Sequence, residues 1–209
     1  MAAFFYNPHS MFISTYGLPV FEESLAASYD LTKVFTAEFC IRPFIVEHPQ
    51  TMIRLRQWSH DPDEHVRRLV SEGTRPRLPW AARLPAFVAD PEPVIALLDM
   101  LKDDPSDYVL RSVGNNLNDI AKDHPQRAVE VAATWMPGRR RLVRRGLRTL
   151  VKAGDPHAAQ AESIALTFTR QARRRMARNV RGVEKNEDGE FDALAGFALE
   201  RGAYPWDVI

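Results

Sequence analysis

The chain has 209 residues and a formal net charge of +1, and its 45% hydrophobic and 26% charged residues are ordinary for a globular protein. This length allows one domain of ordinary size or two very small ones, and the single cysteine, Cys40, excludes an intrachain disulfide and fits a reducing compartment. No apolar run is long enough for a membrane span, and the N-terminal residues lack the pattern of a signal peptide, so we expect a cytoplasmic protein with no membrane partner.

The near-neutral total hides two blocks of opposite charge. Residues 139–181 contain thirteen Lys and Arg but only two acidic residues, whereas residues 182–209 contain seven acidic residues and two basic ones. Charge separated in this way indicates a polyanionic partner for the basic block.

Prolines divide the middle of the chain into short segments. Five of them follow Asp or His, and an Asp N-cap with a proline in the first turn is typical of a helix start. These pairs are His48-Pro49, Asp61-Pro62, Asp90-Pro91, Asp104-Pro105 and His124-Pro125. Apolar residues recur at helical spacing between the pairs, so the sequence predicts an all-α chain from about residue 20 to 155.

The predicted helices form a repeat. Asp61–Val70 matches Asp104–Val113 at a shift of about 43 residues, and Arg141–Leu147 continues the register. Helix pairs of about 40 residues are typical of HEAT repeats, which bury their apolar faces by stacking, so we predict an α-solenoid with a concave basic face. The predicted repeat domain covers residues 1–156, with a degenerate first repeat at 20–45, whose second helix is Leu31–Phe39, and further repeats at 48–80, 90–122 and 124–155. Residues 157–209 are predicted to form a divergent charged tail, helical in part at Ile164–Val180.

Several kinds of site have no motif in this sequence. It lacks the glycine-rich loops that bind nucleotides, and its histidines and cysteine lack the spacing of a zinc site, so we expect no cofactor and no metal. Cys40 is expected to be buried and inert, and Trp58 and Trp135 are expected in the core. Any chemistry must then come from carboxylates and arginines.

Polar residues form a stripe along each second helix of the repeat. Residues at i, i+4 and i+8 lie one above another on a helix, and stacking brings successive stripes side by side. The stripes are Glu64, Arg68 and Glu72, then Asp107, Arg111 and Asn115 with Asp119 one turn on, and last Arg141, Arg145 and Thr149. One interpretation is a solvated ladder of ion pairs, and the other is a DNA-binding face that carries one or two catalytic acids.

Two further features favour the DNA-binding interpretation. The third repeat contains six arginines without an acidic residue within one turn, and an anion would relieve their mutual repulsion. They are Arg139, Arg140, Arg141, Arg144, Arg145 and Arg148. The loop Gly73–Trp80 places Arg75 and Arg77 on either side of a proline and ends in Trp80, a set that can hold phosphates and stack on a sugar or base. The alternatives are a basic surface that serves solubility and an indole that packs between repeats.

Four segments resemble the AlkC branch of the HEAT-like bacterial alkylpurine DNA glycosylases. They are Phe35–Phe44, His65–Trp80, Leu101–Val109 and Asn115–Asp123, and the resemblance covers about residues 30–155. It implies an α-solenoid that cradles duplex DNA and excises cationic N-alkylated purines such as 3-methyladenine, with no metal and no nucleotide cofactor. The third repeat departs from the family, because Arg141–Arg148 reads Arg-Leu-Val-Arg-Arg-Gly-Leu-Arg where we expect Trp-Leu-Val-Arg-His-Ala-Leu-Arg.

The resemblance also implies roles for single residues. Glu72 and Asp107 fall where the family places acidic residues near the lesion, although a glutamate is expected at position 107, and both are predicted to be catalytic. The residues predicted to bind DNA are Arg68, Arg75, Arg77, Trp80, Arg111, Asn115, Arg144, Arg145, Arg148 and Lys152. We expect a monomer at the bacterial nucleoid whose partner is duplex DNA with alkylated bases. The alternative functions are a non-catalytic repeat protein that binds DNA structure and a protein–protein scaffold.

Overall fold

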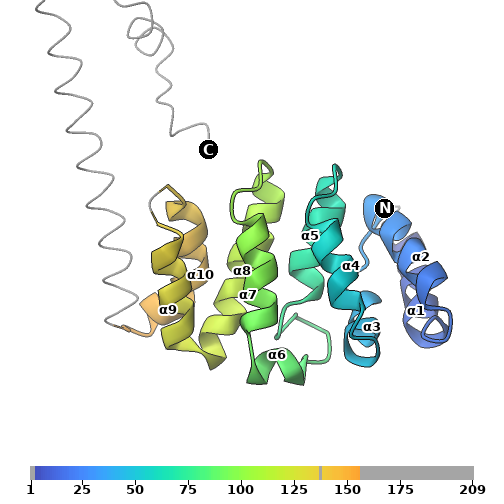
Figure 1. Ribbon diagram of the computed structural model, residues 1–209, viewed down its shortest axis with the longest axis horizontal. Coiled ribbons are helices and arrows are strands. Elements are labelled where there is room, and N and C mark those ends of the chain that lie inside the picture. The colour runs from blue at the N-terminus through green and yellow to red at the C-terminus, as the bar shows by residue number, and fades with distance from the viewer. Residues whose placement is uncertain (1–2, 137, 156–209) are drawn as a thin grey trace, which may run out of the picture. The chain divides into compact units, whose positions relative to one another are not determined.

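The computed structural model describes residues 3–136 and 138–155, and these residues form helices and connecting turns, with no strand among them (Figure 1). A 3-10 helix at Ala3–Tyr6 precedes the α-helices. The α-helices are α1 (Asn7–Tyr16), α2 (Phe21–Val34), α3 (Ile41–Glu47), α4 (Thr51–Trp58), α5 (Glu64–Gly73), α6 (Pro85–Ala89), α7 (Glu92–Leu101), α8 (Asp107–Asp123), α9 (Pro125–Thr134) and α10 (Arg140–Lys152). The all-α prediction is confirmed for this part of the chain.

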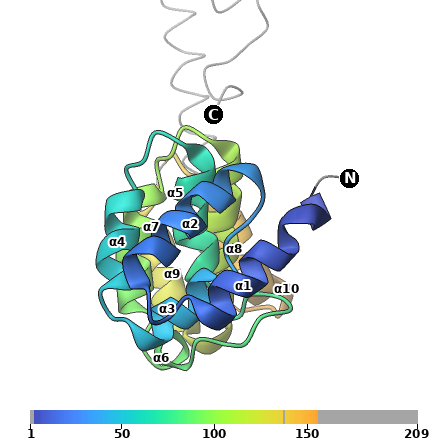
Figure 2. The ribbon, with the colours of Figure 1, turned by 90° about the vertical axis from the view of Figure 1, so that its right-hand side faces the viewer.

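The helices stand in a row of antiparallel pairs, α4 with α5, α7 with α8 and α9 with α10 (Figure 1). The second helices of the pairs, α5, α8 and α10, pack against one another along the row. Viewed along the row, α4 and α7 lie on one side and α8 and α10 on the other (Figure 2). Two layers of stacked helices are the architecture of a helical-repeat solenoid, as predicted.

The helix starts lie close to the predicted Asp-Pro pairs, but the capping residue is different from the one expected. The carboxylates of Asp61 and Asp104 each accept a hydrogen bond of 2.8 Å from the backbone N–H two residues later. That later residue is the actual N-cap: Asp63 caps α5 and Ser106 caps α8. An Asp-Pro pair therefore forms a turn that leads into the cap, because Asp side chains readily bond the backbone two residues on.

The predicted helix at Leu31–Phe39 is wrong in its second half. Helix α2 ends at Val34 and the chain turns before α3 begins at Ile41. Val34, Phe35 and Thr36 all have weak helix propensity, which explains a break at this point. The break has a consequence for the polar site described below, because it places Glu38 on a turn. Helix α6, which lies between two of the predicted repeats, had no counterpart in the prediction.

The core lies between the two layers and is built from the predicted apolar faces. Trp58 and Trp135 are buried, as expected, and so is the Cys40 thiol, whose pKa is raised by burial. Close packing between α8 and α10 depends on Gly146, because a Cβ at this position would lie 2.6 Å from Cδ2 of Leu117. The glycine that interrupts the arginine-rich helix thus allows the two backbones to approach.

Two predictions concern the ends of the chain. The charged tail at 157–209, with its helix at Ile164–Val180, lies outside the described residues. Among the residues that the structure describes, no helix is both long and apolar enough to cross a membrane.

Candidate functional site

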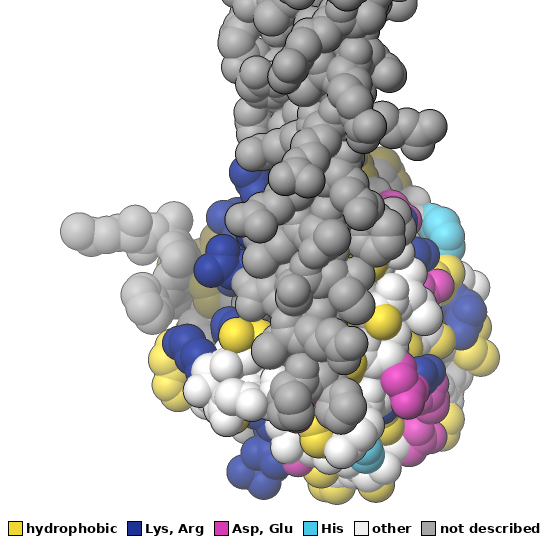
Figure 3. All heavy atoms as spheres, turned by 90° about the vertical axis from the view of Figure 1, so that its left-hand side faces the viewer, with side chains coloured by type: hydrophobic (Ala, Val, Ile, Leu, Met, Phe, Trp, Pro, Cys, Tyr) yellow, Lys and Arg dark blue, Asp and Glu magenta, His cyan; other side chains and the backbone are white. Residues whose placement is uncertain are grey.

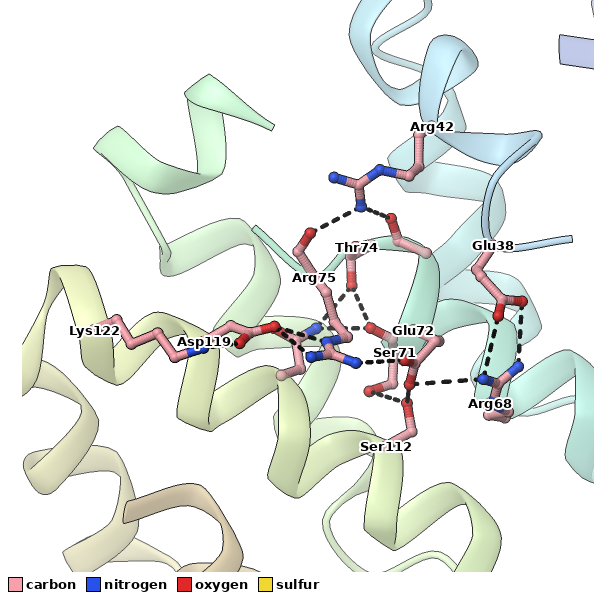
Figure 4. A network of polar contacts seen from close by, with 12 residues as sticks. Glu38, Arg42, Arg68, Ser71, Glu72, Thr74, Arg75, Ser112, Asp119 and Lys122 are labelled. Carbon is pink, nitrogen blue, oxygen red and sulfur yellow. Dashed lines mark hydrogen bonds and ion pairs between the residues drawn. The ribbon is translucent and has the colours of Figure 1, made fainter. Parts of the chain in front are cut away.

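A buried carboxylate, Glu72, lies between α5 and α8 and is held by groups from both helices (Figure 4). Its side chain is on the last turn of α5, and the residue is only 7% exposed. One oxygen accepts a hydrogen bond from Nη1 of Arg75 at 2.6 Å, and the other accepts one from Oγ of Ser112 on α8, also at 2.6 Å. Nη2 of Arg68, one turn earlier on α5, lies 3.9 Å from the second oxygen.

Arg75 links this carboxylate to a second one. Its Nε donates to Asp119 on α8 at 2.7 Å, and Asp119 is in turn bound by Nζ of Lys122 at 2.8 Å. Burial alone would lower the pKa of Arg75, but the hydrogen bond to Asp119 and the charges of Glu72 and Asp119 raise it above its ordinary value. The guanidinium is therefore a fixed positive charge between two carboxylates.

Arg68 connects the same carboxylate to the N-terminal part of the chain. Both of its terminal nitrogens donate to Glu38, at 3.2 and 3.3 Å, and its guanidinium lies 5.1 Å from the ring centroid of Tyr108. Burial would lower the pKa of Arg68, but the charges of Glu38 and Glu72 raise it. Glu38 reaches this position because α2 ends early and the chain turns toward α5.

The turn after Glu72 is fixed by a buried arginine from α3. Nη1 of Arg42 donates to the carbonyl oxygens of Gly73 and Arg75, at 3.0 and 2.8 Å, and Nη2 donates to that of Ala82 at 2.6 Å. Burial and the nearby charge of Arg75 lower the pKa of Arg42 to about 10. One side chain thus ties both ends of the loop that follows α5 to the body of the repeat domain.

The structure separates the second predicted catalytic acid from this network. Asp107 is the first residue of α8, and its side chain is exposed, whereas Ser112, which binds Glu72, lies more than one turn further along. Arg111 is also exposed, and Asn115 is half-buried. An acid in the first turn of a helix is stabilised there by the unpaired N–H groups of the helix start.

The basic residues of α10 lie near the end of the row of helices, where Lys and Arg side chains gather along one edge (Figure 3). Arg144, Arg145 and Lys152 are exposed, and Arg148 is half-buried. The side chain of Arg145 crosses α8 at Gly114, where a Cβ would lie within 2.9 Å of three of its carbons. Burial and the charge of Arg145 lower the pKa of Arg148, so these cations destabilise one another.

Two predictions about unpaired arginines need correction. Arg139 has no acid nearby in the sequence, but the fold brings Asp103 to it, with Nη2 donating at 2.6 Å. Arg77 of the loop is likewise paired, with Nε donating to Asp123 at 2.7 Å. Arg75 was expected to hold phosphate, yet it is 7% exposed and its guanidinium is engaged by Glu72 and Asp119. The expected surplus of free cations is therefore smaller than the sequence indicates.

Trp80, by contrast, is open to solvent. The residue is 98% exposed, and its φ of 61° lies in the left-handed region that non-glycine residues rarely adopt. The alternative in which this indole packs between repeats is thus wrong for the described part of the chain.

Five members of the network were not predicted to be site residues: Glu38, Arg42, Ser112, Asp119 and Lys122. Only Asp119 carried a signal, because it extends the polar stripe of α8 by one turn. The others come from turns or from a helix face without a charged pattern. The described residues hold no cluster of His, Cys, Asp and Glu that could bind a metal ion.

The arrangement can supply a charged carboxylate of fixed orientation. Two short hydrogen bonds hold the oxygens of Glu72, and a carboxylate has about four acceptor sites, so it can accept further bonds. A fixed negative charge at a nearly dry position can stabilise a developing positive charge or orient a water molecule.

Comparison with known proteins finds relatives of this chain. The chain is 45% identical over 151 residues to the uncharacterized protein YhaZ of Bacillus subtilis (strain 168), a match that covers 70% of this chain and 42% of that protein. Among solved structures, it resembles the alkylpurine DNA glycosylase AlkC of Pseudomonas fluorescens, bound to DNA containing an abasic site analog. The TM-score is 0.70 and the identity 42%, and the match covers 73% of this chain and 44% of AlkC.

The chain therefore spans less than half the length of both relatives. The family model described as DNA alkylation repair enzyme matches residues 18–145, which is more than half of the chain and includes α2 to α9 and every acidic residue of the buried network. The chain belongs to the DNA alkylation repair enzyme family.

Proposed function

We propose that this chain is a DNA glycosylase that excises cationic N-alkylated purines, such as 3-methyladenine, from duplex DNA. The observation that carries the proposal is the buried Glu72 carboxylate, held by Arg75 and Ser112 in a chain that belongs to the DNA alkylation repair enzyme family. The solved AlkC complex, with its abasic site analog, supports DNA as the partner.

The chemistry suits a carboxylate without a metal. An alkylated purine that carries a positive charge is already a good leaving group, so hydrolysis needs little protonation of the base. As the N-glycosidic bond breaks, positive charge develops on the sugar, and Glu72 is proposed to stabilise this charge and to orient the water that attacks C1′. The purine leaves with the bonding electrons, and the water adds to C1′ and gives its proton to the Glu72 carboxylate, which releases it to solvent.

Other residues are assigned supporting roles. Arg68 and Arg75 are proposed to hold Glu72 in place rather than to contact phosphate, because both face buried carboxylates. Asp107, exposed at the start of α8, is proposed as a second acid that meets the DNA only in the complex.

Phosphate binding is proposed for the exposed cations and for Asn115 beside them. The exposed cations are Arg111, Arg144, Arg145 and Lys152, and the half-buried Arg148 and Asn115 complete the set. The proposed acting form is a monomer on chromosomal DNA at the bacterial nucleoid.

The direct test is release of free base. Duplex DNA treated with a methylating agent is incubated with the protein, and the released bases are separated by chromatography. We expect 3-methyladenine above the level from spontaneous loss, and no release of unmodified adenine. Binding to the same DNA without base release would instead support the non-catalytic DNA-binding alternative, and no binding at all would support the protein–protein scaffold.

A further inference from the structure

The loop between α5 and α6 presents Trp80 in a way that packing within the described residues does not explain. A tryptophan is usually well buried, but Trp80 is 98% exposed, whereas Trp58 and Trp135 are 8% and 2% exposed. Its backbone has a φ of 61°, a conformation that costs free energy for a bulky residue. Backbone strain and the exposure of a large apolar ring both cost free energy in the protein alone. Their combination at one residue therefore indicates that a ligand binds the ring.

The loop is held on both sides of Trp80. Arg42 binds the carbonyl oxygens of Arg75 and Ala82, one before the indole and one after it. Leu78 and Leu84 are 6% and 3% exposed, so they anchor the loop in the core. Trp80 is therefore presented by a fixed loop, and little conformational entropy is lost when the ring meets a partner.

The charge around the indole favours a nucleic acid. The segment from Gly73 to Ala89 contains no acidic residue. Its Arg75 and Arg77 are paired with carboxylates of α5 and α8, but Arg83 is exposed three residues after Trp80. The same loop starts directly after Glu72, the proposed catalytic carboxylate. Aromatic rings beside cations are the usual platform for unstacked bases.

We propose that Trp80 stacks on an unpaired nucleobase of DNA, exposed where a lesion or an abasic site interrupts the base stack. The inference rests on the proposed function, because it takes damaged duplex DNA as the substrate. An intact duplex keeps its base faces covered, so Trp80 discriminates between interrupted and intact DNA. It is a recognition residue and takes no part in the chemical step.

Binding affinities provide the first test. The Kd is measured for a duplex with an abasic-site analog and for the intact duplex of the same sequence. We expect Trp80→Ala to weaken binding to the interrupted duplex by about tenfold or more and to leave binding to the intact duplex unchanged, since one base–aromatic stack is worth about that much. Trp80→Phe, which keeps a ring, should retain most of the preference. Phe12→Ala on α1, which removes a ring that is 65% exposed, is the matched control and should change neither Kd.

Fluorescence provides a second, direct readout. A base stacked on an indole quenches its emission, so emission of the wild-type protein should fall when the abasic duplex is added. The Trp80→Phe variant should lose this change, and the difference between the two proteins reports Trp80 alone. An unchanged preference in Trp80→Ala, or equal quenching in Trp80→Phe, would overturn the proposal. A lower melting temperature of Trp80→Ala without a change in binding would also overturn it, because the indole would then pack on the protein.

These readouts are independent of base release. If the protein releases no 3-methyladenine but Trp80→Ala loses the preference for interrupted DNA, the proposed glycosylase function fails and the stacking role stands. If the protein releases 3-methyladenine and Trp80→Ala binds both duplexes like the wild type, the stacking role fails alone.

Discussion

At the scale of single residues, the Glu72 carboxylate is contacted by two arginines and a hydroxyl. The contributions of its charge and of its shape can be tested separately. Glu72→Gln keeps the shape, because the amide oxygen can accept from Arg75 while the amide nitrogen donates to Ser112, whose hydroxyl can also accept. Loss of the charge should reduce base excision by about 10²-fold or more, as for one lost electrostatic stabiliser. Single-turnover release of 3-methyladenine measures this, and DNA affinity should be unchanged or higher.

Glu38→Gln is the matched control for that experiment. Glu38 is buried like Glu72, at 8% against 7% exposed, and it also faces Arg68. The control removes the same charge from the same network without touching Arg75 or Ser112. If both variants lose activity equally, the network as a whole is needed, and if Glu72→Gln stays within about twofold of the wild type, its catalytic assignment is wrong.

The sequence singled out Glu72 as a candidate catalytic acid but could not predict which side chains surround it. Glu72 stood out on the stripe of α5 because residues four apart share a helix face. Ser112, which binds Glu72, lies 40 residues further along the chain, and Asp119 lies 44 residues beyond its partner Arg75. Helix periodicity says nothing about which turn of one helix meets which turn of the next. For this reason Arg75, expected to be a phosphate ligand, proved to be the buried link between two carboxylates.

At the scale of helices, local sequence rules predicted the existence of the helices better than the residues at which they begin and end. The Asp-Pro pairs marked the helix starts of α5 and α8 correctly, but the true caps lie two residues later. The end of α2 at Val34 depends on weak propensity in three successive residues, a small effect that the surrounding apolar pattern masked. The short helix α6 lies in a proline-rich loop where periodicity gives no signal.

Gly146 offers a test of helix packing. Alanine is favoured over glycine within a helix by about 1 kcal/mol, yet its Cβ would lie 2.6 Å from Cδ2 and 3.0 Å from Cγ of buried Leu117. Overpacking of this kind costs about 1–3 kcal/mol, so Gly146→Ala should lower the free energy of unfolding by about 1 kcal/mol. Denaturant unfolding measures the change. In a Leu117→Ala background, where the space is open, the same substitution should be neutral or stabilising; an equal loss in both backgrounds would contradict close packing as the cause.

The ion pair between the loop and the end of α8 makes stability depend on pH. The hydrogen bond from Arg77 lowers the pKa of Asp123 below its ordinary value of about 3.9, more than burial raises it. The stabilisation is therefore present above about pH 4 and is lost as the pH falls through the lower pKa of the folded state. Asp123→Asn should cost about 1 kcal/mol at about pH 6 and much less at about pH 3, as measured by denaturant unfolding. A cost independent of pH would mean that the charge is not responsible.

At the scale of the whole molecule, the proposed catalytic centre and the proposed DNA-binding surface lie differently with respect to the family match. The match covers residues 18–145, which include Glu72, Asp107 and the buried network, and it ends within α10. Arg148 and Lys152 lie beyond it. All residues of the proposed catalytic centre thus lie within the matched part of the chain, whereas the basic surface of α10 lies only partly within it.

That surface can be tested through the salt dependence of DNA binding. Each phosphate contact releases counterions, so the slope of log affinity against log salt becomes shallower by about 0.9 for each contact removed. Replacing Arg144, Arg145 and Arg148 by alanine should therefore reduce the slope by about 3 and weaken binding to all duplexes alike, as measured by fluorescence anisotropy at several salt concentrations.

The matched control replaces three arginines of α4 and α9, Arg54, Arg56 and Arg127, which removes the same charge. Arg54 and Arg127 are already paired with Glu22 and Glu92, so this triple variant should keep the wild-type slope. Equal changes in both variants would mean that net charge, not the α10 surface, sets the affinity for DNA.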